Sequence, residues 1–489
     1  MHRSMTRVSA AVTAGAAFTA LGLTGGAAAS AGITGAQAAK SQTLAVSGTQ
    51  LWVSRYSGRG NSYDNADSMA TAAGRVFVTG SSAGTAGNGD YATVAYSSAT
   101  GARLWVKRYN GPANKSDDAA AVAVSPDGTK VFVTGRSQTS QPSPEAQDAY
   151  YSDYATVAYN AATGARLWVR RYSGPAGKED EASSVSVARD GSTVFVTGSS
   201  QTTTSGSDYV TIAYSSAAGA QLWVKRYNGP GNGWDRAASV ASPGDGKVYV
   251  TGSSFGGAGT KEDYATVAYR TLSGARLWVN RYNGPGNGWD QASSLAVSTD
   301  RSRVFVTGSS YSATNADYAT VAYGAATGER LWVKRYNSSA DSFDVASSVS
   351  VSPGGKVFIT GASAGTTSSS DYATVAYSAA SGAQQWVKRY NGPANSWDEA
   401  TSIASPGNGK VYLTGLSTGL STGEDYATIA YSIATGERLW VKRYNGPAKR
   451  TDDAYCVVAS RDRTKVFITG TSDSGTVKRL DYATIAYRG

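Results

Sequence analysis

Histidine and cysteine are almost absent from this chain of 489 residues, which contains only His2 and Cys456. His2 falls in a segment that we expect to be removed, so the mature protein would have no histidine. That composition excludes Ser-His-Asp and Cys-His nucleophilic catalysis, and zinc or haem sites that depend on histidine. A single cysteine cannot form an internal disulfide, and the apolar neighbours of Cys456 predict a buried side chain rather than a nucleophile.

Charged residues are also sparse, at 16% of the chain, and no stretch beyond the N-terminal region approaches the roughly 18 apolar residues of a membrane-spanning helix. Arg3 and Arg7 precede a run of apolar and small residues from 8 to 23, and small-x-small sites end at Ala29 and at Ala38. Residues 1–38 are therefore predicted to be a signal peptide and processing region. We expect residues 43–489 to form a secreted, extracellular monomer without a membrane span.

The feature that is abundant is an internal repeat of 53 to 63 residues. Each repeat contains an Ala/Ser/Val run, a Val-Phe-Val-Thr-Gly run, an Asp-Tyr-Ala-Thr-Val-Ala-Tyr run and a Leu-Trp-Val run. All four are rich in β-branched and aromatic residues and are bounded by turn residues, which predicts four strands per repeat. Eight tryptophans mark the period: Trp52, Trp105, Trp168, Trp223, Trp278, Trp332, Trp386 and Trp440.

Four-stranded repeats of this length are typical of propeller blades. The chain begins its repeats with an isolated Leu51-Trp52-Val53 strand and ends them with a third-type strand, Asp481 to Tyr487. These fragments together make one blade, and each strand type then occurs eight times. The predicted fold is an all-β, eight-bladed propeller of antiparallel blades, in which the N-terminal strand closes the last blade and removes an open sheet edge.

The segment Ala158-x-Asn160-x-x-Thr163-Gly164-x-x-x-Trp168 resembles the tryptophan-docking motif of the pyrroloquinoline quinone (PQQ) type propellers, the quinoprotein alcohol dehydrogenase-like family. This resemblance implies that the eight tryptophans are structural and pack between blades. The family's enzymes are expected to carry a vicinal cysteine pair with an acidic calcium site, or a histidine base, and neither set is present here. We therefore predict no cofactor, while PQQ and calcium remain open.

An aspartate stands twelve residues after each tryptophan, and an aromatic residue often precedes it. If the first strand of each blade is innermost, these residues lie near the mouth of the central channel. There they could bind a sugar by stacking and hydrogen bonding, or bind a cation; alternatively, the aspartates cap the loop backbone. The candidate ligand-binding residues are Tyr63, Trp234, Trp289, Phe343, Trp397, Asp235, Asp290 and Asp398. Ser116, Glu179 and Thr451 replace the ring in other repeats, which predicts that the rings are exposed.

Two further patterns concern charge. The aspartate of each Asp-Tyr strand and the arginine three residues after each tryptophan, for example Asp90 and Arg108, are predicted to form a structural ion pair. Basic pairs such as Lys107-Arg108 would line the perimeter. There they would either prevent the edge strands from pairing with other sheets or bind an anionic polymer. The loop from Gly135 to Asp153 is longer than its counterparts and is either functional or a tolerated insertion.

The sequence thus predicts a secreted, non-enzymatic binding propeller. Its partner would be a carbohydrate or cell-wall polymer, bound through the channel-mouth face, and nucleic acid is not expected. No catalytic residues or metal ligands can be assigned. The alternative is an enzyme, either an atypical quinoprotein dehydrogenase or a glycosidase that uses only carboxylates such as Glu179-Asp180-Glu181 or Asp452-Asp453.

Overall fold

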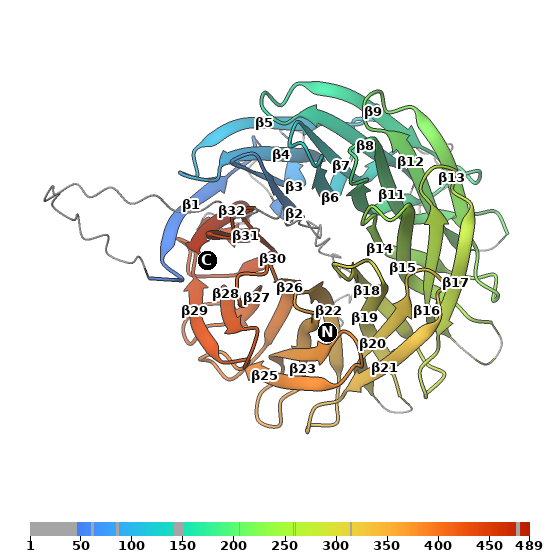
Figure 1. Cartoon of the computed structure of the whole chain (residues 1–489). Helices are drawn as coiled ribbons and strands as arrows, with labels where there is room; N and C mark the ends of the chain where they lie inside the picture. The colour runs from blue at the N-terminus through green and yellow to red at the C-terminus, as the bar shows by residue number, and fades with distance from the viewer. Residues whose placement is uncertain are drawn as a thin grey trace, which may run out of the picture.

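Eight four-stranded antiparallel sheets form a closed ring (Figure 1). The computed structural model describes residues 46–59, 63–84, 88–140, 151–204, 206–257, 259, 261–312, 315–475 and 480–489. Within these residues every regular element is a strand. Each sheet is one blade, with its first strand nearest the axis of the ring and its fourth strand at the perimeter. The predicted all-β, eight-bladed propeller is therefore confirmed.

The blades follow the chain in order. Blade 1 contains β2 (Asp64–Ala72), β3 (Arg75–Ala83), β4 (Gly89–Ser97) and β5 (Arg103–Tyr109). Blade 2 contains β6 (Asp117–Val124), β7 (Lys130–Gln138), β8 (Ser152–Asn160) and β9 (Arg166–Tyr172). Blade 3 contains β10 (Asp180–Val187), β11 (Thr193–Gln201), β12 (Ser207–Ser215) and β13 (Gln221–Tyr227). Blade 4 contains β14 (Asp235–Ala241), β15 (Lys247–Phe255), β16 (Glu262–Arg270) and β17 (Arg276–Tyr282).

The second half of the ring repeats this arrangement. Blade 5 contains β18 (Asp290–Val297), β19 (Arg303–Tyr311), β20 (Ala316–Gly324) and β21 (Arg330–Tyr336). Blade 6 contains β22 (Asp344–Val351), β23 (Lys356–Ser363), β24 (Asp371–Ser378) and β25 (Gln384–Tyr390). Blade 7 contains β26 (Asp398–Ala404), β27 (Lys410–Thr418), β28 (Glu424–Ser432) and β29 (Arg438–Tyr444). Blade 8 contains β30 (Asp452–Ala459), β31 (Lys465–Asp473), β32 (Leu480–Arg488) and β1 (Gln50–Tyr56).

The N-terminal strand closes the ring. β1 pairs with β32 in antiparallel register, from Trp52 opposite Ala486 to Tyr56 opposite Tyr482. This pairing gives blade 8 the fourth strand that the C-terminal end of the chain lacks, as predicted. The predicted signal peptide and processing region, residues 1–38, lies outside the described residues. None of the described residues forms a helix long and apolar enough to cross a membrane.

The second and third strands of each blade form the core. In β7, for example, Val131, Phe132 and Val133 are all fully buried. A continuous apolar run is favourable here because both faces of a blade are covered by neighbouring blades. Cys456 is also buried, in the interior of blade 8, as its apolar neighbours predicted.

Each tryptophan packs against the following blade. The ring of Trp105 lies between Phe77 of its own blade and Tyr159 of blade 2, and its indole N–H donates to the carbonyl of Ala161 at 3.1 Å. Gly164 of blade 2 lies directly over the ring with a φ of +68°, and a Cβ there would come within 2.7 Å of Cδ2 of Trp105. The glycine of the docking motif is therefore required by close approach as well as by backbone conformation. The structural role of the tryptophans is confirmed.

Tyrosines and arginines provide two further connections between blades. The buried hydroxyl of Tyr91 donates to the carbonyl of Ala155 in the next blade, and Tyr482 repeats this contact across the closure by donating to Ala92. The predicted ion pair between the third and fourth strands forms in all eight blades. In blade 1, Arg108 pairs with Asp90 at 2.9 Å and also donates to the hydroxyl of Tyr56 in blade 8.

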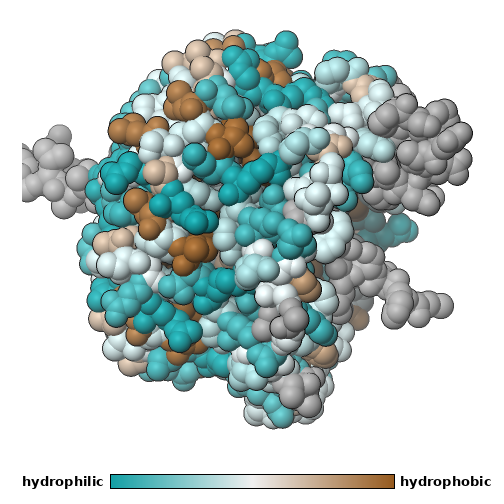
Figure 2. Space-filling view, turned by 90° about the vertical axis from the view of Figure 1, so that its right-hand side faces the viewer, coloured by the Kyte–Doolittle hydropathy of each residue, from teal (hydrophilic) through white to brown (hydrophobic). Residues whose placement is uncertain are grey.

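The perimeter exposes single apolar side chains. Leu104, Leu167, Leu222, Leu277, Leu331 and Leu439 precede the docking tryptophans on the outer strands and are exposed. In the region of β13 and β17, Figure 2 shows that apolar side chains on this surface are separated by polar ones. Isolated exposed leucines of this kind are ordinary for a soluble protein and do not mark an interface.

Replacing Trp105 with alanine should lower the free energy of unfolding by about 3–5 kcal/mol, because it empties a packed site between two blades and removes a hydrogen bond. The adjacent Leu104 is the matched control on the same strand, since it is 47% exposed whereas Trp105 is 8% exposed. Leu104→Ala should cost less than about 0.5 kcal/mol. Denaturant unfolding measures both, and equal effects would contradict the packing described here.

Candidate functional site

The connections between strands emerge at two ends of the ring. In every blade the connection from the second to the third strand, and the connection from the fourth strand to the next blade, lie at one end, which we call the loop face. The turns that join the first to the second strand and the third to the fourth lie at the other end, which we call the turn face. This separation follows from the antiparallel order of the four strands. The candidate aromatic residues all lie on the loop face.

The aspartates proposed as ligands are not on the surface, which corrects that part of the sequence interpretation. Asp235, Asp290 and Asp398 are buried at 0–1% exposure, and each begins an inner strand. Their Oδ2 atoms accept hydrogen bonds from the backbone N–H groups of Gly229, Gly284 and Gly392 at 2.6–2.7 Å. These carboxylates cap the loop that enters each blade, which is the alternative role that the sequence left open.

In most blades the cap is accompanied by glycine at the start of the loop. A Cβ on Gly229 would lie 2.2 Å from Oγ of Ser254 and 2.8 Å from Oδ1 of Asp235. Six other blades place glycine at this position, and blade 6 uses Ser338, whose N–H still donates to Asp344 at 2.8 Å. The loop from the outer strand to the next inner strand is therefore held by the same buried carboxylate in all eight blades.

The aromatic residues that precede these aspartates are exposed, as predicted. Tyr63, Trp234, Trp289, Phe343 and Trp397 have exposed fractions of 40–55%. Four of them, from Trp234 to Trp397, occupy the same loop position in the consecutive blades 4, 5, 6 and 7. We call these four residues the aromatic arc. Blades 2, 3 and 8 carry Ser116, Glu179 and Thr451 instead.

The backbone of the aromatic arc is fixed although its rings are exposed. The carbonyl of Trp234 accepts from the N–H of Phe255, and the carbonyl of Trp289 accepts from the N–H of Tyr311, both at 3.2 Å. Residues 234 and 397 also form isolated bridges with the start of the third strand of the preceding blade. Each ring is therefore presented from a rigid position and loses little conformational freedom when a ligand binds.

Side chains from adjacent strands and loops surround the arc, and sequence reasoning missed them. Arg236 lies 5.4 Å from the ring centre of Trp234, and Lys261 lies 5.4 Å from that of Trp289. Tyr311 contacts Phe343 edge-on with ring centres 6.1 Å apart. Phe255 packs where a Cβ on Gly233 would stand. Phe255 and Tyr311 occupy a strand-end position that is small or polar in the other blades, a signal that was available in the sequence.

The residue after each capping aspartate is the second residue of an innermost strand, and several of these side chains contact the preceding blade, as Gln291 does by donating to Glu262. Several of these residues are acidic. Asp118 and Glu181 both pair with Arg136, at 2.8 and 2.9 Å. Among the described residues Asp453 has no such cation: burial and the nearby carboxylate of Glu424 raise its pKa to about 7, and Glu399 adds to the effect. Burial also raises the pKa of Glu399.

These residues do not fit a calcium-bound quinone. Calcium prefers six to eight oxygen ligands, and the described residues contain no group of three or more Asp, Glu, His or Cys side chains arranged to hold a metal. PQQ itself carries carboxylates, whereas Asp118, Glu181, Glu399 and Asp453 make the positions nearest the axis acidic. Arg136 is already paired with two of these carboxylates.

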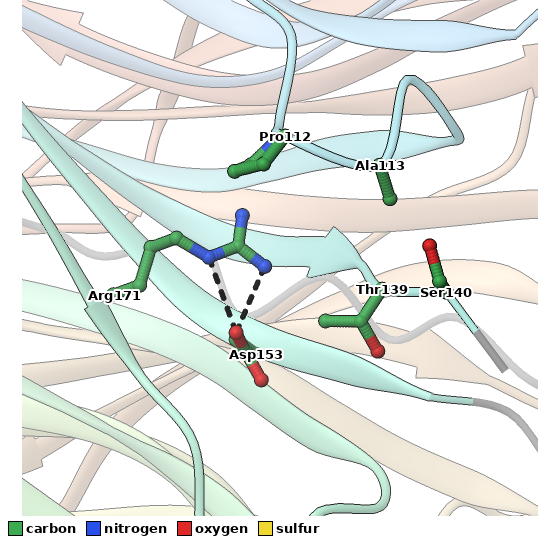
Figure 3. Close-up of a pocket in the computed structure, with 6 residues that line it drawn as sticks. All are labelled: Pro112, Ala113, Thr139, Ser140, Asp153 and Arg171. Atoms are coloured by element: carbon green, nitrogen blue, oxygen red, sulfur yellow. Dashed lines mark hydrogen bonds and ion pairs between the residues drawn. The ribbon is translucent and has the colours of Figure 1, made fainter. Parts of the chain in front are cut away.

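Two shallow openings occur between blades 1 and 2, away from the aromatic arc. The smaller, of about 300 Å³, is lined by Pro112, Ala113, Thr139, Ser140, Asp153 and Arg171 (Figure 3). Arg171 faces Asp153 within it at 2.8 Å, as one of the eight structural ion pairs. The larger, of about 590 Å³, lies beside the outer strand β9. Much of the long loop, residues 141–150, lies outside the described residues. The two charged residues of the smaller opening are paired with each other, whereas Arg166, which lines the larger opening, is exposed.

With this geometry established, comparisons with known proteins identify the family. The family model described as outer membrane protein assembly factor BamB, a PQQ-type repeat, matches residues 206–484. The chain belongs to this family. The search of curated proteins found no match to the sequence.

The family's fold is shared by solved structures of diverse proteins. A europium-containing methanol dehydrogenase is 12% identical with a TM-score of 0.53, over 90% of this chain and 93% of that protein. The quinohemoprotein alcohol dehydrogenase of Comamonas testosteroni is 12% identical with a TM-score of 0.52, over 89% and 76%. Chaetomium thermophilum Sqt1, solved bound to the N-terminus of ribosomal protein L10, is 12% identical with a TM-score of 0.54, over 85% and 94%. At these identities the similarity concerns the fold alone.

The raised pKa of Asp453 predicts an unusual dependence of stability on pH. The folded protein keeps a proton on this group up to about pH 7, whereas the unfolded chain loses it near pH 4. The free energy of unfolding should therefore fall as the pH rises from 4 to 7, by up to about 4 kcal/mol from this group. Asp453→Asn should flatten that slope. Unfolding of both proteins at several pH values tests this, and identical slopes would contradict it.

Proposed function

We propose that the protein is a binding propeller whose loop face holds a polysaccharide against the aromatic arc. The observation that carries this proposal is the run of exposed rings at one loop position of four consecutive blades, 4 to 7. Blade 1 adds Tyr63 at this position, whereas blades 2, 3 and 8 have polar residues there. A scaffold residue would repeat in all eight blades, as the capping aspartate does. Four of the five rings lie in consecutive blades, and such clustering is typical of a site.

The chemistry around the rings favours a sugar over an apolar partner. Aromatic faces stack on the apolar faces of pyranose rings, while sugar hydroxyls need hydrogen-bonding groups nearby. Arg236 and Lys261 lie against two of the rings, and the loops between the rings are rich in asparagine and glycine. One ring per blade leaves polar surface between successive rings, which suits a linear polymer better than a flat apolar protein surface. The predicted signal peptide supports an extracellular site of action.

A glycoside hydrolase that uses only carboxylates is a second candidate. Asp453 supports it, because a carboxyl group with a pKa near 7 next to a second carboxylate, Glu424, suits a general acid. In that case the wild-type protein should release reducing ends from the bound polysaccharide, and Asp453→Asn should abolish the release without weakening binding. Binding with no release of reducing ends favours the non-enzymatic propeller.

The triple variant Trp234→Ala, Trp289→Ala, Trp397→Ala should lose binding to a polysaccharide that the wild type binds, with little loss of stability because the rings are partly exposed. The assay is pull-down with insoluble cellulose, chitin and purified cell-wall material, followed by titration with soluble oligosaccharides of any material that binds. Even if only two of the three rings stack on the sugar, their loss should weaken binding at least about tenfold.

The matched control removes similar apolar area from the perimeter, through Leu167→Ala, Leu222→Ala and Leu331→Ala, which are exposed to a similar extent. This control should bind as the wild type does. Unchanged binding by the tryptophan variant, or unfolding of that variant, would overturn the proposal.

A further inference from the structure

The turn face carries the net positive charge of the molecule. In each blade it comprises the turn after the first strand, through the first residue of the second strand. It also comprises a second turn, which runs from the last residue of the third strand to the first residue of the fourth strand. In blade 8, where the two ends of the chain meet, this second turn consists of Arg488, Gly489 and residues 46–50. The two turns of a blade are hydrogen-bonded to one another, as the N–H of Ala161 is to the carbonyl of Thr129.

These turns contain eighteen Lys and Arg residues against seven Asp and Glu residues, a net charge of +11. The whole chain has a net charge of +10, so everything outside the turn face sums to −1. The loop face holds the acidic residues near the axis and the buried capping aspartates. The propeller is therefore electrically polarised from one end to the other.

Thirteen of the eighteen cations are arginines. Five of them, Arg103, Arg166, Arg276, Arg330 and Arg438, begin the fourth strands of their blades and are exposed. None of these five forms a side-chain ion pair with another residue in the described part of the chain. Sister blades place Gln50, Gln221 and Gln384 at this position, so the fold does not require the arginine.

The perimeter, where the sequence suggested that an anionic polymer could bind, is less suitable. The arginines of its basic pairs already form the structural ion pairs, as Arg108 does with Asp90. The lysine stems lie over the turns of the next blade: a Cβ on Gly164 would be 2.8 Å from Cε of Lys107. Beyond the ion-paired arginines, the rim thus keeps at most one basic residue per blade, whereas the turns together carry a net charge of +11.

We propose that the turn face binds a linear polymer of phosphodiester groups that carries no bases. Guanidinium groups match phosphate oxygens in geometry, and a positive field spread over a ring of turns attracts an extended polyanion at many points. Nucleic acid is a poorer fit, because the exposed aromatic rings of the described residues lie on the loop face and leave nothing to stack on bases.

An anionic membrane is also a poorer fit. The large apolar side chains that are strongly exposed on the turn face, Val46 and Leu272, belong to blades 8 and 4. These blades lie on opposite sides of the ring (Figure 1), so the two side chains cannot form a common apolar anchor. Peripheral proteins that bind membranes generally combine charge with buried apolar area. The face offers charge without that area, which suits a polymer in solution or in a wall.

The test measures binding of poly(glycerol phosphate) to the complete protein at 50 mM and 200 mM NaCl. The test variant combines Arg103→Gln, Arg166→Gln, Arg276→Gln, Arg330→Gln and Arg438→Gln, and so uses the residue found in sister blades. We expect this variant to bind at least about tenfold more weakly, and the wild type to weaken by about tenfold or more at the higher salt concentration. The melting temperature of the variant and its binding to neutral polysaccharide should equal those of the wild type.

The matched control removes five cations from the loop face, through Arg59→Gln, Lys115→Gln, Lys178→Gln, Lys449→Gln and Arg450→Gln. Net charge falls equally in the two variants. The control should lose no more than about threefold, since its cations lie farther from the turn face than a Debye length of about 8–10 Å. Equal losses in the two variants would overturn the proposal. Tighter binding of the wild type to duplex DNA, or to vesicles of phosphatidylglycerol and phosphatidylcholine, would overturn it as well.

Discussion

In every blade the tyrosine that follows the ion-paired aspartate of the third strand donates a hydrogen bond to the main chain of the following blade, and the ring depends on this contact. A phenolic hydroxyl buried without a partner costs several kcal/mol, and the partner of Tyr91, the carbonyl of Ala155, belongs to another blade. The same dependence holds for the docking tryptophans and the ion-paired arginines. A single blade therefore cannot satisfy its own polar groups. Only a closed ring gives all eight of these tyrosines their partner, and β1 supplies the strand that closes it.

Because every blade meets the same requirement, the scaffold leaves little freedom except at its two ends. Residues that repeat eight times, such as the capping aspartates, are committed to the frame. Residues that vary between blades at an equivalent position are not needed by the frame. Their chemistry differs between the two ends of the propeller. The aromatic arc and the acidic residues near the axis lie on the loop face, whereas unpaired arginines gather on the turn face. The two faces of one scaffold thus offer different chemistry to different partners.

The architecture was predictable from sequence because it depends on period and on strand composition. The spacing of the tryptophans gave eight blades, and the fragments at residues 51–53 and 481–487 gave the closure. Exposure of the rings followed from Glu179, which occupies the position of Trp234 in another blade. Burial of Asp235 did not follow, because spacing places a residue in a loop without showing which way its side chain points.

Other features depended on which elements meet in space. Arg236, from β14, lies over Trp234, and Lys261, from the loop before β16, lies over Trp289. No periodicity of the sequence reports such contacts. The charge of the turn face was hidden because it is divided among sixteen short turns, each with only a few charged residues. Once the strands were known, each turn could be assigned to one end of the propeller, because successive connections in an antiparallel blade alternate between the two ends.

The central claim is that the loop face of blades 4 to 7 is a binding site for a linear polysaccharide. Hydrogen exchange of the backbone, measured with and without a bound oligosaccharide, tests it most directly. The arrangement predicts slower exchange in residues 228–234, 283–289, 337–343 and 391–397, the loops that carry the aromatic arc, with no change in the corresponding loops of blades 2 and 3. Protection of the turn face, or equal protection of all eight loops, would contradict it.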